Sequence, residues 1–273
     1  MKLVDLHIHS SYSDGIFQPE YIVDKIYLNS IPGFSITDHD SFEAIDIVIN
    51  YLKKKKFNRN ILFIPGCEFS SYDKNIGEIH IIGYFKNNDY KKVENFTKEF
   101  QTYRLNRAKN IINCLKKNGY EISEDEIIQS EKKAIGRLNI ARELVKKGFF
   151  PSISEAFEKM LRSGTPCYFK KKEETPEKII EIIKEHNGNA VIAHPTFLSN
   201  LNDWNFLKNW KKIGLWGIEC YHPKISESFA KKIIENLKDD FAITGGSDFH
   251  GDDKNLEIGQ YGILIEKAME ILA

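Results

Sequence analysis

Histidine and acidic residues lie together in short clusters that are spread from one end of the chain to the other. Six of the eight histidines belong to these clusters. Imidazole and carboxylate groups are the ligands that divalent transition metals accept, and the clusters hold too many of them for one ion. The fold must therefore bring distant segments together around a multinuclear metal centre. The expected metal ligands are His7, His9, Asp14, His39, Glu68, His80, His194, Asp248 and His250.

Two clusters contain a pair of candidate ligands with one residue between them. His7 and His9 end a strand-like segment, where side chains two apart face the same side and lie roughly 7 Å apart along the backbone. Asp248 and His250 repeat this spacing after a second apolar segment. A lone histidine in a strand is more often a hydrogen-bonded core residue, but two such pairs favour metal binding. Asp38 or Asp40, beside His39, could instead cap the helix that follows.

Short apolar segments alternate with helical patterns over most of the chain. Strands are expected at residues 3–8, 33–37, 61–68, 79–84, 190–193, 217–219, 242–246 and 261–264, and helices at residues 19–28, 41–54, 176–185 and 227–237. Alternation of this kind predicts an α/β fold with a parallel sheet or a barrel. The candidate ligands then lie at or just beyond strand ends.

The middle of the chain has a different pattern. From residue 93 to residue 175 the apolar residues follow a helical period, with helices expected at 96–115, 138–147 and 152–161. We interpret this segment as a helical insertion that caps the substrate. The predicted organisation is a barrel in two parts, residues 1–92 and 176–273, interrupted by residues 93–175.

Composition excludes several classes of partner. Lys plus Arg and Asp plus Glu are equal at 39 each, so no net charge favours extended binding to duplex nucleic acid. No apolar stretch reaches the roughly 18 residues of a membrane span, and we expect a cytoplasmic protein with no membrane partner. The four cysteines form no CxxC pair and are expected to be reduced, buried and inert. The sequence gives no indication of oligomeric state.

The order of the motifs resembles the polymerase and histidinol phosphatase (PHP) superfamily. The resemblance rests on residues 5–10, Ser13-Asp14-Gly15, residues 37–40, Pro65 to Glu68, residues 80–84, residues 193–195 and residues 247–250. It implies a distorted (β/α)7 barrel that holds up to three divalent metal ions, with Mn, Fe or Zn all compatible.

The resemblance also assigns the ligands to three ions. His7, His9, Glu68 and Asp248 would bind one ion, with Glu68 as the bridging carboxylate. Glu68, His80 and His194 would bind a second. Asp14, His39 and His250 would bind a third. No ligand position of the pattern is missing, which argues against a non-catalytic PHP domain.

The insertion carries a second, weaker resemblance. Gly136-Arg137 followed by Ala141-Arg142, and later Gly164 to Tyr168, is similar to the stand-alone PHP phosphoesterases. That group includes nucleoside 3′,5′-bisphosphate phosphatases and 5′-to-3′ exoribonucleases. Arg137 and Arg142 are thus expected to bind substrate phosphate, although both could be solvated helix charges.

The expected roles of the remaining polar residues follow. Arg104 and Arg107 are expected at the surface, with a basic rim as the alternative. His222 follows a strand and could contact the phosphate or donate a proton; otherwise it is a structural histidine. Glu68, Asp248 and His222 are the expected catalytic residues.

The predicted reaction is metal-dependent hydrolysis of a nucleotide phosphate ester. Its substrate would be a small nucleotide, such as a nucleoside 3′,5′-bisphosphate, or the 5′ end of short single-stranded RNA. One alternative is a histidinol-phosphatase-type phosphomonoesterase. The other is a non-catalytic, metal-stabilised module that binds phosphorylated ligands.

Overall fold

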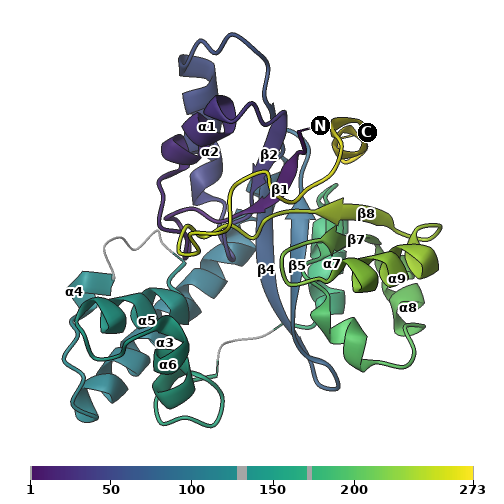
Figure 1. The fold of residues 1–273 in the computed structure, drawn as a ribbon. Helices are drawn as coiled ribbons and strands as arrows, with labels where there is room; N and C mark the ends of the chain where they lie inside the picture. The colour runs from purple at the N-terminus through teal and green to yellow at the C-terminus, as the bar shows by residue number, and fades with distance from the viewer. Residues whose placement is uncertain (1, 128–133, 171–173, 273) are drawn as a thin grey trace.

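The computed structural model describes residues 2–127, 134–170 and 174–272, in which eight strands form two sheets (Figure 1). The first sheet is parallel and contains β1 (Asp5–Ile8), β2 (Gly33–Ile36) and β3 (Leu62–Phe63). The second contains, in order, β4 (Gly66–Asp73), β5 (Gly77–Tyr84), β6 (Asn189–Ile192), β7 (Leu215–Tyr221) and β8 (Ala242–Gly245). β6, β7 and β8 are parallel, whereas β5 is antiparallel to both β4 and β6. The predicted α/β class is confirmed.

The strands of the described residues differ from the expected seven-stranded barrel. The two sheets meet through isolated bridges, between Ile8 and Phe249 and between His39 and Glu68, and no closed sheet is detected in the described residues. The segment expected as one strand at 61–68 is divided between β3 and β4 at Pro65, which has no N–H to donate to a ladder. Residues 261–264 form a single bridge through Ile263 instead of a strand.

Helices cover the sheets where the sequence predicts them. α1 (Pro19–Leu28), α7 (Pro176–Glu185) and α9 (Glu227–Leu237) have the expected bounds, and α2 (Glu43–Lys54) begins two residues later than expected. The Thr175 and Ser226 side chains accept N–H groups of the first turns of α7 and α9. The pattern analysis missed α8 (Phe206–Ile213) and the short α10 (Ile265–Met269). Short 3₁₀ turns lie at η1 (Asp89–Lys92) and η3 (Thr196–Asn200).

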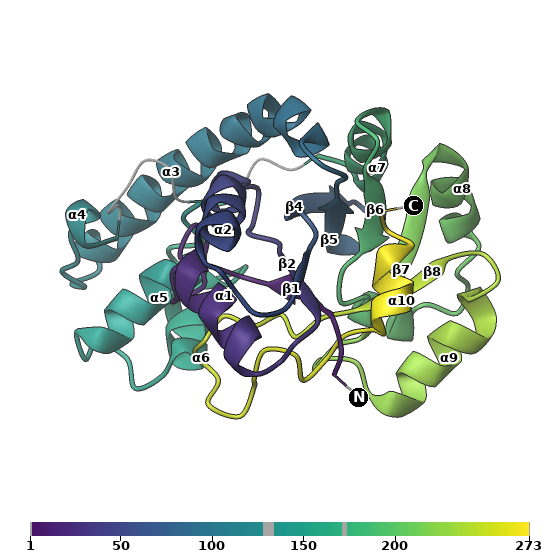
Figure 2. The same cartoon turned by 90° about the horizontal axis from the view of Figure 1, so that it is seen from above.

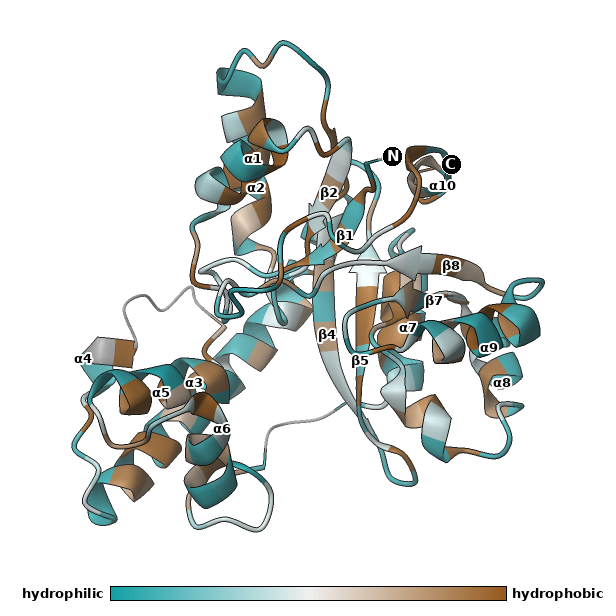
Figure 3. Ribbon diagram, in the orientation of Figure 1, coloured by the Kyte–Doolittle hydropathy of each residue, from teal (hydrophilic) through white to brown (hydrophobic). Residues whose placement is uncertain are grey.

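The helices between β5 and α7 form a lobe beside the sheets, drawn in blue-green and teal in Figures 1 and 2. It contains α3 (Glu94–Lys117), α4 (Glu124–Ile127), α5 (Arg137–Lys146), α6 (Ile153–Ala156) and the π-helix η2 (Phe157–Leu161). Its helices bury their own cluster of apolar side chains, including Ile112, Leu144 and Leu161. Figure 3 shows apolar and polar segments alternating along these helices. The lobe therefore has a hydrophobic core of its own.

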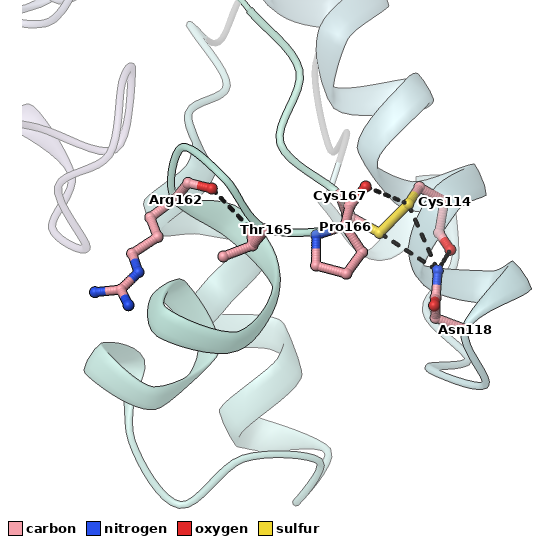
Figure 4. Close-up of a disulfide and its surroundings, with 6 residues drawn as sticks. All are labelled: Cys114, Asn118, Arg162, Thr165, Pro166 and Cys167. Carbon is pink, nitrogen blue, oxygen red and sulfur yellow. Dashed lines mark hydrogen bonds between the residues drawn. A yellow bond between two sulfur atoms is a disulfide. The ribbon is translucent and has the colours of Figure 1, made fainter.

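A disulfide in this lobe contradicts the expectation that all cysteines are reduced. Cys114 of α3 is bonded to Cys167, with the two Cα atoms 5.6 Å apart (Figure 4). The two cysteines are 53 residues apart in sequence, so no local spacing motif indicates that they form a bond. Cys67 and Cys220 are free and buried, as expected.

No helix among the described residues is both long and apolar enough to cross a membrane.

Candidate metal centre

The nine predicted ligands converge where the strands of the two sheets end. His7 lies on β1, Glu68 on β4 and His80 on β5, whereas the others follow β1, β2, β6 and β8. Two glycines allow the close approach of these segments. A Cβ at Gly246 would lie 2.3 Å from the Cβ of His7, and one at Gly15 would lie 2.3 Å from the His9 carbonyl oxygen. Side chains at these positions would push the ligand-bearing backbones apart.

The residues of the first group are buried. The Nε2 atoms of His7 and His9 are 3.1 Å apart. Glu68 Oε2 lies 3.5 Å from His7 Nε2 and 3.2 Å from His9 Nε2. Asp248 Oδ1 lies 3.4 Å and 3.3 Å from the same two nitrogen atoms. Four ligand atoms thus face one small space, in the combination that the sequence predicts.

Glu68 also faces a second group through its other oxygen. Glu68 Oε1 is 2.9 Å from His80 Nδ1 and 2.9 Å from His194 Nε2. The two oxygens of one buried carboxylate therefore point at two different sets of histidines, which is the geometry of a bridging ligand.

The third group surrounds Asp14. Its Oδ2 is 3.6 Å from His39 Nε2, and its Oδ1 is 3.2 Å from His250 Nε2. His9 contributes its second nitrogen here, because His9 Nδ1 lies 3.6 Å from Asp14 Oδ1. The groups therefore share both Glu68 and His9.

The donor set fits divalent cations. Glu68 Oε2 and His39 Nδ1 are buried without a hydrogen-bond partner, although they lie 2.9 Å apart. Two imidazole nitrogens face each other at the first group, where at most one can donate a hydrogen to the other. Buried polar atoms without partners are costly, and a shared cation would satisfy them together.

The carboxylates of the centre are ionised. Burial alone would raise the pKa of Glu68 and Asp14, but the surrounding histidines outweigh it and hold both pKa values well below their usual range. The same balance lowers the pKa of Asp248, with His7 as its strongest favourable neighbour. Ionised carboxylates are the form that binds metal.

Sequence reasoning missed Glu219 as part of this centre. Its Oε1 lies 3.1 Å from His7 Nδ1, and its Oε2 accepts the backbone N–H of His194 at 2.8 Å. A carboxylate on the far nitrogen of a metal-binding histidine fixes the tautomer and orientation of the ring. The available signal was Glu219 itself, an acidic residue in an apolar strand segment.

A cavity of about 470 Å³ opens over the three groups. Six of the nine predicted ligands line it, together with Leu138 of α5 and the acidic residues Asp252 and Asp253. Lys224, which the sequence analysis did not single out, also lines it. Its Nζ is 2.7 Å from Asp248 Oδ2, although the side chain is largely exposed. Lys224 is the one lysine or arginine among the described lining residues.

His222 lies beside Asp248 and is fully buried. Its Nδ1 accepts the backbone N–H of Lys224 at 3.0 Å, so in the neutral ring Nε2 carries the hydrogen. That Nε2 faces Asp248 Oδ2 at 3.3 Å. The ring therefore points at a candidate ligand.

The two arginines of α5 occupy different places. Arg142 contacts the Asp252 carboxylate and the backbone carbonyl of Asp14, which ties α5 to two loops of the centre. Arg137 donates to the Leu161 carbonyl at 3.2 Å, and its Nη2 lies 3.9 Å from Glu78 Oε2. Arg137 does not line the cavity described above.

The expectation that Arg104 and Arg107 lie at the surface is wrong. They are only 7% and 9% exposed. Arg104 is drawn inward by the buried carboxylate of Asp40, to which its Nε donates at 2.7 Å. Arg107 is held by the Phe169 carbonyl, which its Nε reaches at 2.6 Å.

Comparison with known proteins shows the family of this chain. The family model described as the PHP domain matches residues 5–187. This chain belongs to the PHP domain family. The match includes the motifs of the sequence-based resemblance from residues 5–10 to residues 80–84, whereas those at residues 193–195 and 247–250 lie beyond it.

Two PHP relatives span nearly the whole chain. A 5′-3′ exoribonuclease of Haemophilus influenzae is 27% identical over 278 residues, covering 99% of this chain and 98% of the relative. A 3′,5′-nucleoside bisphosphate phosphatase of Chromobacterium violaceum is 26% identical over 261 residues, covering 92% and 88%. In fold, the chain is similar to a solved structure from Bifidobacterium adolescentis described as that of a metal-dependent phosphoesterase. The TM-score is 0.88 at 23% identity, covering 98% of this chain and 95% of that one.

Proposed function

We propose that this PHP protein hydrolyses phosphate esters of nucleotides, either nucleoside 3′,5′-bisphosphates or the 5′ ends of short single-stranded RNA. The two relatives described above act on these two kinds of molecule, according to their names. The observation that carries the proposal is the position of Glu68, whose two oxygens face separate groups of histidines at the floor of an open cavity.

Up to three divalent ions fit the proposed ligands, and Mn, Fe and Zn are all compatible with carboxylate and imidazole groups. Ions held there would activate water and neutralise charge on the phosphoryl oxygens. His7, His9, Glu68 and Asp248 would hold one ion, Glu68, His80 and His194 a second, and Asp14, His39 and His250 a third.

The remaining polar residues have positioning roles in this proposal. Lys224 lines the cavity and can turn from Asp248 toward a phosphoryl oxygen, because its side chain is largely exposed. His222 would hold Asp248 in place instead of protonating the leaving group, because its only accessible hydrogen points at that carboxylate. Arg142 would keep α5, and with it Leu138, over the cavity.

We further propose that the helical lobe of residues 93–175 acts as the cap on the substrate. We also interpret the two sheets as one distorted barrel, because β1 lies beside β8 and β2 lies beside β4.

The test is a panel of phosphate esters with the purified protein and added Mn²⁺. Adenosine 3′,5′-bisphosphate and a short 5′-phosphorylated RNA should be hydrolysed faster than histidinol phosphate. His9→Ala and Asp248→Ala should abolish hydrolysis and lower the bound metal measured by mass spectrometry. Full activity in either variant would remove these residues from the centre, and preferred turnover of histidinol phosphate would replace the proposed substrate class.

A further inference from the structure

A buried carboxylate beside the metal centre has no part in the proposed ligand set. Asp38 follows β2 and precedes the candidate ligand His39, and it is only 1% exposed. The helix cap that the sequence left open for Asp38 is not formed, because α2 begins after Phe42 without a side-chain cap. A buried carboxylate is costly unless its oxygens accept hydrogen bonds. The contacts of Asp38 therefore point to its role.

Asp38 holds the turn that follows β1. Its Oδ1 accepts the backbone N–H of Ser10 at 2.7 Å and the hydroxyl of Ser13 at 2.6 Å. Its Oδ2 accepts the hydroxyl of Ser10 at 2.5 Å. The turn lies between the candidate ligands His9 and Asp14, so Asp38 connects the end of β2 to the segment that carries both.

The backbone of Asp38 is joined to β4 on its other side. The Glu68 N–H donates to the Asp38 carbonyl at 3.3 Å, next to the bridge between His39 and Glu68. The residue that holds the turn is therefore itself tied to the candidate bridging ligand.

Ser13 connects Asp38 to His9. Ser13 Oγ is 2.6 Å from Asp38 Oδ1 but 3.4 Å from Asp14 Oδ1, so its single hydroxyl hydrogen lies in the shorter contact. Ser13 Oγ can then only accept, and His9 Nδ1 lies 3.4 Å from it. Asp14 Oδ1, 3.6 Å from the same nitrogen, is also an acceptor. These two acceptors favour a hydrogen on His9 Nδ1.

The other nitrogen of His9 faces the first group of ligands. Its Nε2 lies 3.2 Å from Glu68 Oε2 and 3.3 Å from Asp248 Oδ1. The hydrogen bond of one imidazole nitrogen determines which nitrogen is left to bind a metal. A hydrogen on Nδ1 leaves the lone pair of Nε2 for an ion shared with these two carboxylates. Glu219 acts on His7 Nδ1 in the same sense.

We propose that Asp38 is a positioning residue that acts through Ser13 on His9. Asp38 accepts the Ser13 hydroxyl hydrogen, Ser13 accepts the hydrogen of His9 Nδ1, and His9 Nε2 is left as the metal ligand. This inference rests on the metal centre of the proposed function. It goes further by assigning one nitrogen of His9 to the ion and the other to a chain of hydrogen bonds.

Asp38→Asn and Ser13→Ala test this chain. The first keeps the size of the side chain but replaces an acceptor with an N–H donor, and the second removes the connecting oxygen. The readout is Zn²⁺ affinity, measured by competition with a fluorescent chelator. We expect each change to weaken Zn²⁺ binding about 10–100-fold, the usual cost of losing a partner of a metal-binding histidine. The double variant should lose no more than the larger single loss, because both changes break the same chain.

Ser71→Ala is the matched control. Ser71 is a buried serine of β4 whose hydroxyl donates to the carbonyl of Ile79, which is not a candidate ligand. This change should lower the melting temperature and leave Zn²⁺ affinity unaltered. An equal loss of affinity in Ser71→Ala would overturn the proposal, because it would show a general effect of a lost buried hydroxyl. Additive losses in the double variant would also overturn it, because Asp38 and Ser13 would then act separately.

Nitrogen NMR of the zinc-loaded protein with isotope-labelled histidine gives a readout that a purely structural role would not change. In the wild type, we expect His9 Nδ1 to carry a hydrogen and His9 Nε2 to bind Zn²⁺. The Nδ1 hydrogen should exchange faster with water in Ser13→Ala. A His9 Nδ1 that binds Zn²⁺ and carries no hydrogen would overturn the proposal.

These measurements do not depend on turnover, so they separate the inference from the proposed function. If the wild-type protein hydrolyses none of the phosphate esters and both variants still weaken Zn²⁺ binding as expected, the proposed function fails and the positioning role stands. If the wild type hydrolyses the nucleotides but both variants keep its Zn²⁺ affinity and its His9 signals, the positioning role fails and the proposed function stands.

Discussion

Charged side chains are arranged differently in the metal centre and in the helical lobe. In the centre, every predicted ligand has an acidic or imidazole neighbour within 3.6 Å, and five of the nine are buried. In the lobe, like charges gather, and Arg107 is left with most of its donors unused. The centre thus brings acidic and imidazole side chains together, whereas the lobe holds its arginines against backbone carbonyls and the buried Asp40.

The largest effect should follow from Glu68→Gln, which keeps the size of the side chain and removes its charge. Loss of the bridging carboxylate should reduce kcat by roughly a thousandfold or more, because metal stabilisation of a transition state amounts to several kcal/mol. Single-turnover kinetics and metal analysis would measure it. If kcat falls less than about tenfold with full metal content, the chemistry does not depend on the centre.

Loss of the disulfide should affect the lobe alone. In the chain-entropy model, opening a loop of this length lowers the free energy of unfolding by about 4 kcal/mol. Cys114→Ser combined with Cys167→Ser should therefore lower the melting temperature while metal content stays constant. The segment after Cys167 also contacts Arg107 and Arg137 through Phe169 and Tyr168, so opening the loop should loosen the packing of α3 against α5.

Reduction provides the control for the disulfide. Dithiothreitol should shift the wild-type melting temperature toward that of the double variant and leave the variant itself unchanged. Metal loss on reduction would contradict the separation between centre and lobe.

Glu219→Gln should have a smaller effect, confined to the centre. The amide keeps the shape but weakens the hold on His7 Nδ1, and loss of such a partner typically lowers metal affinity about 10–100-fold. Competition with a fluorescent chelator would measure this change. Unchanged metal affinity would show that Glu219 does not position His7.

The mildest test is the pH dependence of metal affinity. Burial disfavours the charged form of His9, but the nearby carboxylates of Asp248 and Glu68 outweigh it and raise the pKa of His9 to about 10. A histidine must lose this proton before it binds a metal, so binding at neutral pH releases it. The His9 proton alone should therefore make the metal affinity increase about tenfold per pH unit below the pKa of His9, and the raised pKa of His7 should steepen this increase. A flat profile would show that His9 is not displaced by metal.

The sequence predicts much more of the centre than of the lobe, for a physical reason. Ligand residues such as His7 and Asp248 are costly to bury without a purpose, so their presence at strand ends is informative by itself. Arg104 and Arg107 look like ordinary exposed helix charges, because a helical pattern does not show which distant carboxylate will draw an arginine inward. Asp40 is 64 residues from Arg104 in sequence.

Contacts between segments that are distant in the sequence could not be predicted from it either. The Cys114–Cys167 bond and the contact of Glu219 with His7 depend on tertiary placement that no local spacing encodes. The antiparallel pairing of β4 with β5 was not predicted from the sequence. An apolar strand segment does not show whether the neighbouring strand runs parallel or antiparallel to it. Its consequence is local: His80 lies opposite Ser70 and reaches Glu68 on the adjacent strand.

The bridge between His39 and Glu68 has a mechanical consequence. It is one of the few backbone links between the two sheets, formed where Asp40 N–H donates to the Glu68 carbonyl. His7 belongs to the first sheet and His9 follows its strand β1, whereas Glu68, His80 and Asp248 belong to or follow strands of the second. Cations at the centre would therefore link the two sheets through their ligands. Removing them with a chelator should accelerate hydrogen exchange along β1 and β4 before it affects the helices of the lobe.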